Sequence, residues 1–149
     1  MTVYQPSDAW IGPIITSFYT MISSQVGGLS RIYTVEPDGD LEDNSALIPE
    51  PTWEVKGDTN AKLYLVIHFG IRHIVSRSPD VEDSFPAARA YLYPYLMTLS
   101  TWANQSMSGN AIQMTIKKGG LGQWEHSGII YTALLLQVDV LTEFNIPLT

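Results

Sequence analysis

The stretch AKLYLVIHFGIRHIVSR, residues 61–77, decides the fold class of this chain. His73 interrupts an otherwise regular series of apolar residues at alternate positions, formed by Leu63, Leu65, Ile67, Phe69, Ile71 and Val75. A period of two indicates a β-strand with one buried face, because successive side chains point to opposite sides of a sheet. We predict a strand over 61–77 with either a bulge or a projecting arm, since strands of this length are uncommon, and we expect any break at Gly70.

Two more strands are predicted toward the C-terminus. Apolar and polar residues alternate over 111–118, and residues 128–142 contain the aliphatic run IIYTALLLQVDVL. The sequence GGLGQWEHSG between them predicts a glycine-rich hairpin connection. The tail from Thr142 to Thr149 is expected to be a loose end.

Apolar residues recur at spacings of three and four over 8–25 and 83–104, which predicts two amphipathic helices. Ser7 is the candidate N-cap of the first helix. Pro13 requires that this helix either kink or begin nearby, because proline has no N–H to donate. In the second helix, Pro94 predicts a kink.

A short strand is predicted over 30–35, and the irregular segment EPDGDLEDNSALIPEPTW follows it. At about 18 residues this segment is longer than most loops of compact domains, and such loops are usually functional or disordered. Its alternating acidic residues resemble a calcium-binding loop, but Asp43 and Pro49 stand where that loop needs Gly and Glu. We predict a solvated acidic loop, then a short extended segment at 53–55 and a turn at 56–60.

The predicted order is helix, strand, long loop, strand, long strand, helix, strand, strand. Because helices and strands do not alternate strictly, this order predicts an α+β fold, a mostly antiparallel β-sheet with two main helices packed on one face. The length of 149 residues fits one domain. With no internal repeat or linker in the sequence, we expect a single domain over residues 1–149.

Composition excludes several classes of function. The net charge is −7 and Lys117–Lys118 is the only adjacent basic pair, so tight nucleic-acid binding, which needs a basic surface, is not expected. The chain has no cysteine, which excludes disulfide scaffolds, thiol nucleophiles and thiolate metal sites. No signal peptide or membrane-spanning run is apparent. Only 15% of residues are charged, which predicts an uncharged surface that meets a partner.

The three histidines do not predict a metal site. His68 and His73 are five residues apart and so face opposite sides of the predicted strand, while His126 lies in the predicted hairpin connection. We interpret His73, on the apolar face, as a hydrogen-bonded packing residue. His68 shares the other face with Tyr64 and Arg72, and these three can line a pocket.

Nucleophilic and phosphate-binding motifs are also missing from the sequence. It has no G-x-S-x-G elbow, and the glycines at 119–122 do not match a phosphate-binding loop. Trp124 has few apolar neighbours in its own segment. It either packs back on the core or serves as an interface anchor.

A resemblance to a known family follows from the order of these segments. After the N-terminal helix come Arg31–Tyr33, the excursion VEPDGDLEDNSALIPEPTWEV, the strand IHFGIRHIVSR, the helical segment SPDVEDSFPAARAYLYPYL and the terminal run IIYTALLLQVDVL. In order, length and texture the whole chain resembles the tail terminator, or tail-completion, proteins of tailed bacteriophages, which act in head–tail joining.

The resemblance implies a structural virion protein of the tail or neck, made in the host cytoplasm. Members of that family form a hexameric ring on the tail tube, stop polymerisation of the tube protein and present a surface to a head-completion, stopper or other neck protein. DNA passes through the lumen without specific binding, and no membrane is involved. The resemblance implies no catalysis and no cofactor.

Ring assembly would place two segments at subunit contacts, because a head-to-tail ring buries two different surfaces of each protomer. We hypothesise that these surfaces are the loop at 36–50 and the hairpin at 118–127. Their apolar residues are the predicted contacts, namely Leu41, Leu47, Ile48, Leu121 and Trp124.

Two alternatives remain open at the level of sequence. The chain can be another neck or baseplate component of a phage. It can also be a cone-shaped α+β ligand-binding or isomerase domain, in which Tyr64, His68, Arg72 and tryptophans line a deep closed cavity.

Overall fold

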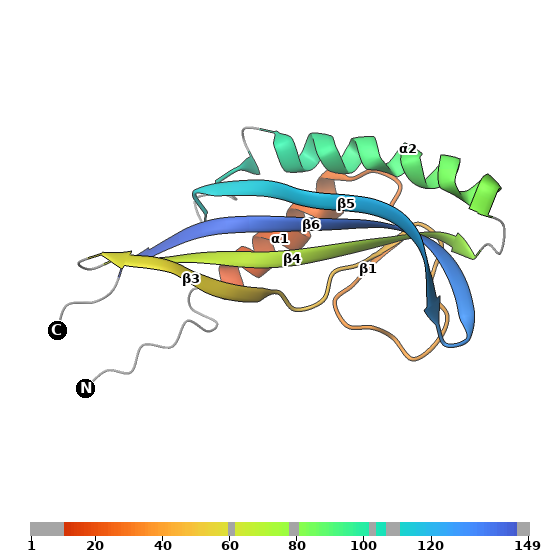
Figure 1. The fold of residues 1–149 in the computed structure, drawn as a ribbon, viewed down its shortest axis with the longest axis horizontal. Helices are drawn as coiled ribbons and strands as arrows, with labels where there is room; N and C mark the ends of the chain where they lie inside the picture. The colour runs from red at the N-terminus through yellow and green to blue at the C-terminus, as the bar shows by residue number, and fades with distance from the viewer. Residues whose placement is uncertain (1–10, 60–61, 78–80, 102–103, 107–110, 146–149) are drawn as a thin grey trace.

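A computed structural model describes residues 11–59, 62–77, 81–101, 104–106 and 111–145. One sheet of six strands dominates it, and two helices pack against one of its faces (Figure 1). The predicted α+β class with a mostly antiparallel sheet is therefore confirmed.

The sheet is built around a long central pair of strands. Its order is β1 (Arg31–Tyr33), β2 (Ser45–Leu47), β4 (Lys62–Arg77), β6 (Ile129–Asn145) and β5 (Gln113–His126), and β3 (Thr52–Thr59) pairs with the first half of β4 on the same side as β2. Every pair is antiparallel except β1 with β2. The prediction of a turn at 56–60 is wrong over 56–59, because β3 continues to Thr59.

The predicted long strand corresponds to β4, but its irregularity lies elsewhere than expected. Gly70 pairs with Gln137 inside an unbroken register, so the predicted break at Gly70 is wrong. The register shifts between Ile74 and Ser76, which leaves Val75 as the extra residue of a bulge. A Cβ built at Gly70 would meet nothing within 4 Å, so no steric demand marks this glycine as a bending point.

The glycine-rich connection predicted between the last two strands is itself a strand. Residues 119–126 belong to β5 and pair with β6 as far as His126 with Ile129. The turn is confined to Ser127 and Gly128, whose φ angles of 52° and 79° suit the two central residues of a type I′ hairpin. The tail is likewise not loose over its first residues, because β6 continues to Asn145 opposite Lys62.

The two helices are α1 (Ile11–Gln25) and α2 (Val81–Ser100). Pro13 lies in the first described turn of α1, where its missing N–H costs no hydrogen bond, so the helix begins near this proline. Ser7, the expected cap, lies outside the described residues. α2 begins two residues earlier and ends four residues earlier than predicted, and the kink at Pro94 stays a prediction.

The main core lies between the helices and the sheet. Phe18 of α1 stacks on Phe69 of β4 with ring centroids 4.0 Å apart, and both are fully buried. A second cluster lies where β4 and the β5–β6 hairpin meet the loop after β1. Its buried members are Tyr33, Leu41, Leu47, Ile74, Tyr131 and Ala133. Because Ile74 follows His73, which contacts α2, this cluster occupies the sheet face that the helices do not cover.

Candidate functional site

The apolar residues of the loop predicted to carry assembly contacts are internal. Leu41, Leu47 and Ile48 have exposed fractions of 3%, 3% and 0%, so their side chains belong to the protomer's own core. Leu47 ends β2, and the Ile48 amide donates to the Tyr33 carbonyl at 2.9 Å. Burial leaves these three residues no surface for a partner, and their predicted role as contacts is corrected. The expected 18-residue irregular loop instead contains a strand of the sheet.

The two predicted contacts in the hairpin are partly buried. Leu121 packs against the main core and Trp124 against the second cluster. The Arg72 guanidinium lies over the Trp124 ring, 4.1 Å from its centroid, which adds a cation–π contact to the packing. Of the two readings of Trp124, the structure favours a packing residue that retains some exposed surface.

The acidic loop and the hairpin tip bind each other. His126 lies between them with its Nδ1 2.7 Å from Glu36 Oε1 and its Nε2 2.9 Å from the Gly39 carbonyl oxygen. Ser127 adds a hydrogen bond from its hydroxyl to the Asp38 carbonyl at 2.9 Å. These contacts join segments about 90 residues apart in sequence, and the curled end of the hairpin beside the loop is visible in Figure 1. Both partners of the His126 ring are acceptors, so both contacts are hydrogen bonds only when both ring nitrogens carry a proton.

A polar cluster lies on the uncovered sheet face. His68 Nδ1 is 2.7 Å from Asp139 Oδ1 and its Nε2 is 3.2 Å from Glu54 Oε1, while Lys117 Nζ lies 4.0 Å from Asp139. The His68 side chain is 25% exposed and the Glu54 side chain is 52% exposed. The predicted trio on this face does not line one pocket. Arg72 borders a cavity of about 150 Å³ that neither Tyr64 nor His68 lines.

His73 is a packing residue, as its place on the apolar face predicted. It is fully buried, with Nδ1 2.7 Å from the Tyr95 hydroxyl and its ring 4.2 Å from the Tyr91 ring. Burial lowers the pKa of His73 to about 4, so the ring is neutral at pH 7. Burial, and secondarily Tyr91, raises the pKa of Tyr95 above its ordinary value.

Neither metal-binding clusters nor membrane-spanning helices occur in the described parts of the chain. No group of three His, Asp or Glu side chains there is arranged to hold a metal ion. No helix there combines the length and the apolar character that crossing a bilayer requires.

Two features at the sheet edges have no direct signal in the sequence pattern. Within the described residues, β3 pairs as a strand only with β4 and β5 only with β6, so one side of each has no neighbouring strand. On β3, Trp53 and Val55 are 46% and 56% exposed. Their cross-strand partners Ile67 and Leu65 identify their face as the helix face.

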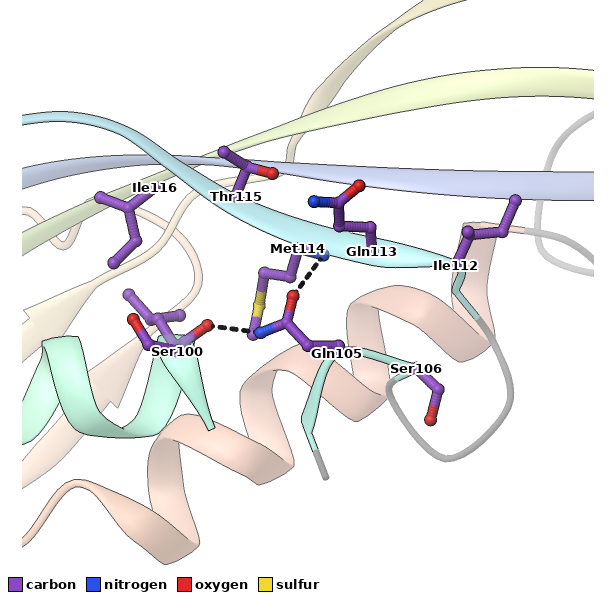
Figure 2. Close-up of a pocket in the computed structure, with 9 residues that line it drawn as sticks. Ser100, Gln105, Ser106, Ile112, Gln113, Met114, Thr115 and Ile116 are labelled. Carbon is purple, nitrogen blue, oxygen red and sulfur yellow. Dashed lines mark hydrogen bonds between the residues drawn. The ribbon is translucent and has the colours of Figure 1, made fainter. Parts of the chain in front are cut away.

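Beside β5, two cavities follow the free edge. The larger, about 850 Å³, lies where α2 ends and β5 begins (Figure 2). There the Gln105 side chain accepts a hydrogen bond from the Met114 amide at 3.0 Å and so covers the first part of the edge. The second, about 340 Å³, lies between α2 and the middle of β5. Its α2 side is lined by Arg89, Leu92 and Leu96, and its β5 side by residues 116–121.

Comparison with known proteins adds no relative: no family model matches the chain, and no curated protein matches it.

Proposed function

We propose that this chain is a structural virion protein of a tailed bacteriophage, a tail terminator that caps the tail tube as a hexameric ring. It stops polymerisation of the tube protein and joins the tail to a head-side neck protein. It acts by assembly and not by catalysis. The proposal begins from the resemblance in segment order and rests structurally on one observation, the two unlike free edges of the sheet.

The two edges favour a ring because they differ from each other. β3 offers exposed apolar side chains, and β5 offers a groove beside unpaired backbone. Contacts between unlike surfaces of identical chains are head-to-tail, and such contacts close into rings when the rotation per subunit allows. Free strand edges are a common site for joining another chain.

Charge is consistent with passage of DNA. The chain carries a net charge of −7, and six copies together would repel a polyanion from the lumen. Five acidic residues lie within residues 36–43, so part of this charge is concentrated in the loop that the hairpin holds. A ring of this composition lets DNA pass without a specific contact.

The alternative of a cone-shaped ligand-binding or isomerase domain requires a deep cavity between helices and sheet. The centre of that space is filled by the main core, in which Phe18, Phe69 and Tyr95 are fully buried. The two cavities that remain beside α2 lie along β5, and neither is lined by Tyr64, His68 or Arg72. Of the three cavities described above, none is lined by more than one of Tyr64, His68 and Arg72. The packing therefore favours the assembly protein over the cone-shaped domain.

Tail tubes made from the tube protein of the same genome test the proposal. We expect the purified chain to bind one end of these tubes as a ring, visible by negative-stain electron microscopy, and to halt their elongation. A protein that neither binds the tubes nor changes their length would contradict the proposed function. Binding to a neck or baseplate complex instead would favour the alternative phage component.

A further inference from the structure

We propose that subunits join edge to edge, with β3 of one copy pairing with β5 of the next and placing Trp53 and Val55 in the groove between α2 and β5. This inference rests on the proposed ring for its biological role. Its structural basis is the match between the two free edges in strand direction, side-chain face and charge.

Strand direction allows this pairing without reversing a subunit. β3 is antiparallel to β4, while β5 and β4 are both antiparallel to β6 and hence parallel to each other. β3 and β5 therefore run in opposite directions at opposite edges of the sheet. When a second copy is placed beside the first with its strands in the same orientation, its β3 meets β5 as an antiparallel neighbour.

The apolar side chains meet the groove because both lie on the helix face. Trp53 and Val55 share the face of their buried partners on β4, and the groove is lined by α2 together with the β5 residues Ile116 and Leu121 of the same face. A sheet that continues across the contact keeps its faces aligned. The groove volume of about 340 Å³ is within the range of cavities that hold a compact ligand, roughly 300–1,000 Å³.

The uncovered face brings opposite charges together. Glu54 faces that side of β3, with about half of its side chain exposed, and Lys118 faces the same side of β5. Gly120 and Gly122 lie on the same face of β5, and a Cβ at either would meet nothing within 4 Å. These glycines leave the β5 backbone bare where the neighbouring strand must approach.

A cysteine-free chain makes the contact directly testable. Two variants, Glu54→Cys and Lys118→Cys, each carry the only cysteine of their chain, and a short bismaleimide reagent links thiols that lie close together. We expect a cross-linked dimer when the two variants are mixed, with or without tail tubes, and none when either is treated alone. A mixture of Val35→Cys with Lys118→Cys is the matched control, since Val35 is 75% exposed but lies outside both edges.

A second pair of variants tests the apolar part of the contact. Val55→Glu places a charge in the groove and is expected to weaken self-association roughly tenfold or more, whereas Val35→Glu leaves it unchanged. Both valines are exposed, so both variants keep the core intact.

The proposed contact is overturned if the mixed Glu54→Cys and Lys118→Cys variants give no cross-link either with or without tail tubes. It is also overturned if one cysteine variant treated alone cross-links as well as the mixture does. Tube capping by the wild-type chain is scored separately, so the contact can fail while the proposed function stands, and the reverse.

Discussion

His73 combines complete burial with an unpaired ring nitrogen. Its Nδ1 bonds to the Tyr95 hydroxyl, and its Nε2 has no hydrogen-bond partner in the described part of the chain. A charged imidazolium there would lack both water and a counter-ion. The groups that face the ring from α2 are the tyrosines Tyr91 and Tyr95, so neither brings a carboxylate to stabilise the cation.

This burial predicts a loss of stability in acid. The pKa of His73 is about 4 in the folded chain and about 6.5 when unfolded, so between these values the unfolded state binds more protons. The free energy of unfolding keeps the full contribution of neutral His73 above pH 6.5. It falls by roughly 3 kcal/mol as the pH drops to 4, because the unfolded chain then binds a proton that the folded chain does not. Urea unfolding of wild type and His73→Gln at several pH values measures it. Identical pH dependence in the two proteins would contradict the assignment.

Two neighbouring glycines on β5 are predicted to differ sharply on substitution. A Cβ at Gly119 would lie 2.8 Å from Leu136 Cδ2 and 3.2 Å from the Leu135 carbonyl oxygen, whereas one at Gly120 meets nothing within 4 Å. The Leu136 side chain can turn aside, but the Leu135 carbonyl belongs to the backbone of β6 and can move only with the sheet. We expect Gly119→Ala to lower the free energy of unfolding by about 1–2 kcal/mol and Gly120→Ala to leave it nearly unchanged. Equal stability of the two variants in denaturant titrations would refute this steric reading.

At the scale of elements, the loop after β1 and the β5–β6 hairpin act as one unit. Leu41 lies in the second cluster and its amide donates to the Tyr131 hydroxyl at 3.0 Å. His126 ties the preceding residues of the loop to the hairpin tip. The loop therefore shields from solvent the part of the second cluster that β4 and the hairpin do not cover.

The loop is predicted to loosen when its anchor is removed. Glu36→Ala deletes the carboxylate that contacts His126, and we expect faster amide hydrogen exchange over 36–44 with a global loss of about 1 kcal/mol, since Glu36 is half exposed. Glu42→Ala is the matched control in the same loop. If exchange increases equally in both variants, or in neither, His126 does not anchor this segment.

Sequence pattern located most elements but misassigned the connections between them. Alternation in β4 and β6 and the stripes of the two helices are local signals, because each repeats within a few residues. β2 is three residues long, and its partners come from β1 and from Arg72–Ile74 of β4. A strand so short has no period of its own, so the loop at 36–50 was expected to be irregular. The glycines of β5 similarly suggested a turn where pairing with β6 imposes a strand.

At the scale of the whole molecule, the sheet is covered by helices on one face and ends in two unlike free edges (Figure 1). The apolar side chains at one edge and the groove at the other are the unlike surfaces through which we propose that the chain self-associates. The polar cluster around His68 lies on the uncovered face, opposite the groove, and its member Glu54 extends this cluster to the β3 edge.

Assembly is predicted to bury Trp53. The indole is 46% exposed in the single chain, and its transfer into an apolar groove shifts tryptophan emission to shorter wavelength and protects it from iodide quenching. We expect both changes as protein concentration rises, and their loss in Trp53→Phe, which keeps an aromatic group for the groove. A concentration-dependent shift that persists in Trp53→Phe would assign the change to another tryptophan.

The sequence by itself determined the α+β class, the two helices, the long strands and the packing role of His73, because each depends on a local period or on residue type. Only the tertiary structure decided that Leu41, Leu47 and Ile48 are core, that the acidic loop is tied to the hairpin, and that Trp53 and Val55 are exposed on a free edge. Burial and exposure of an apolar residue depend on which distant strands and helices lie beside it. The spacing of apolar residues along one segment does not show which distant segments will cover them.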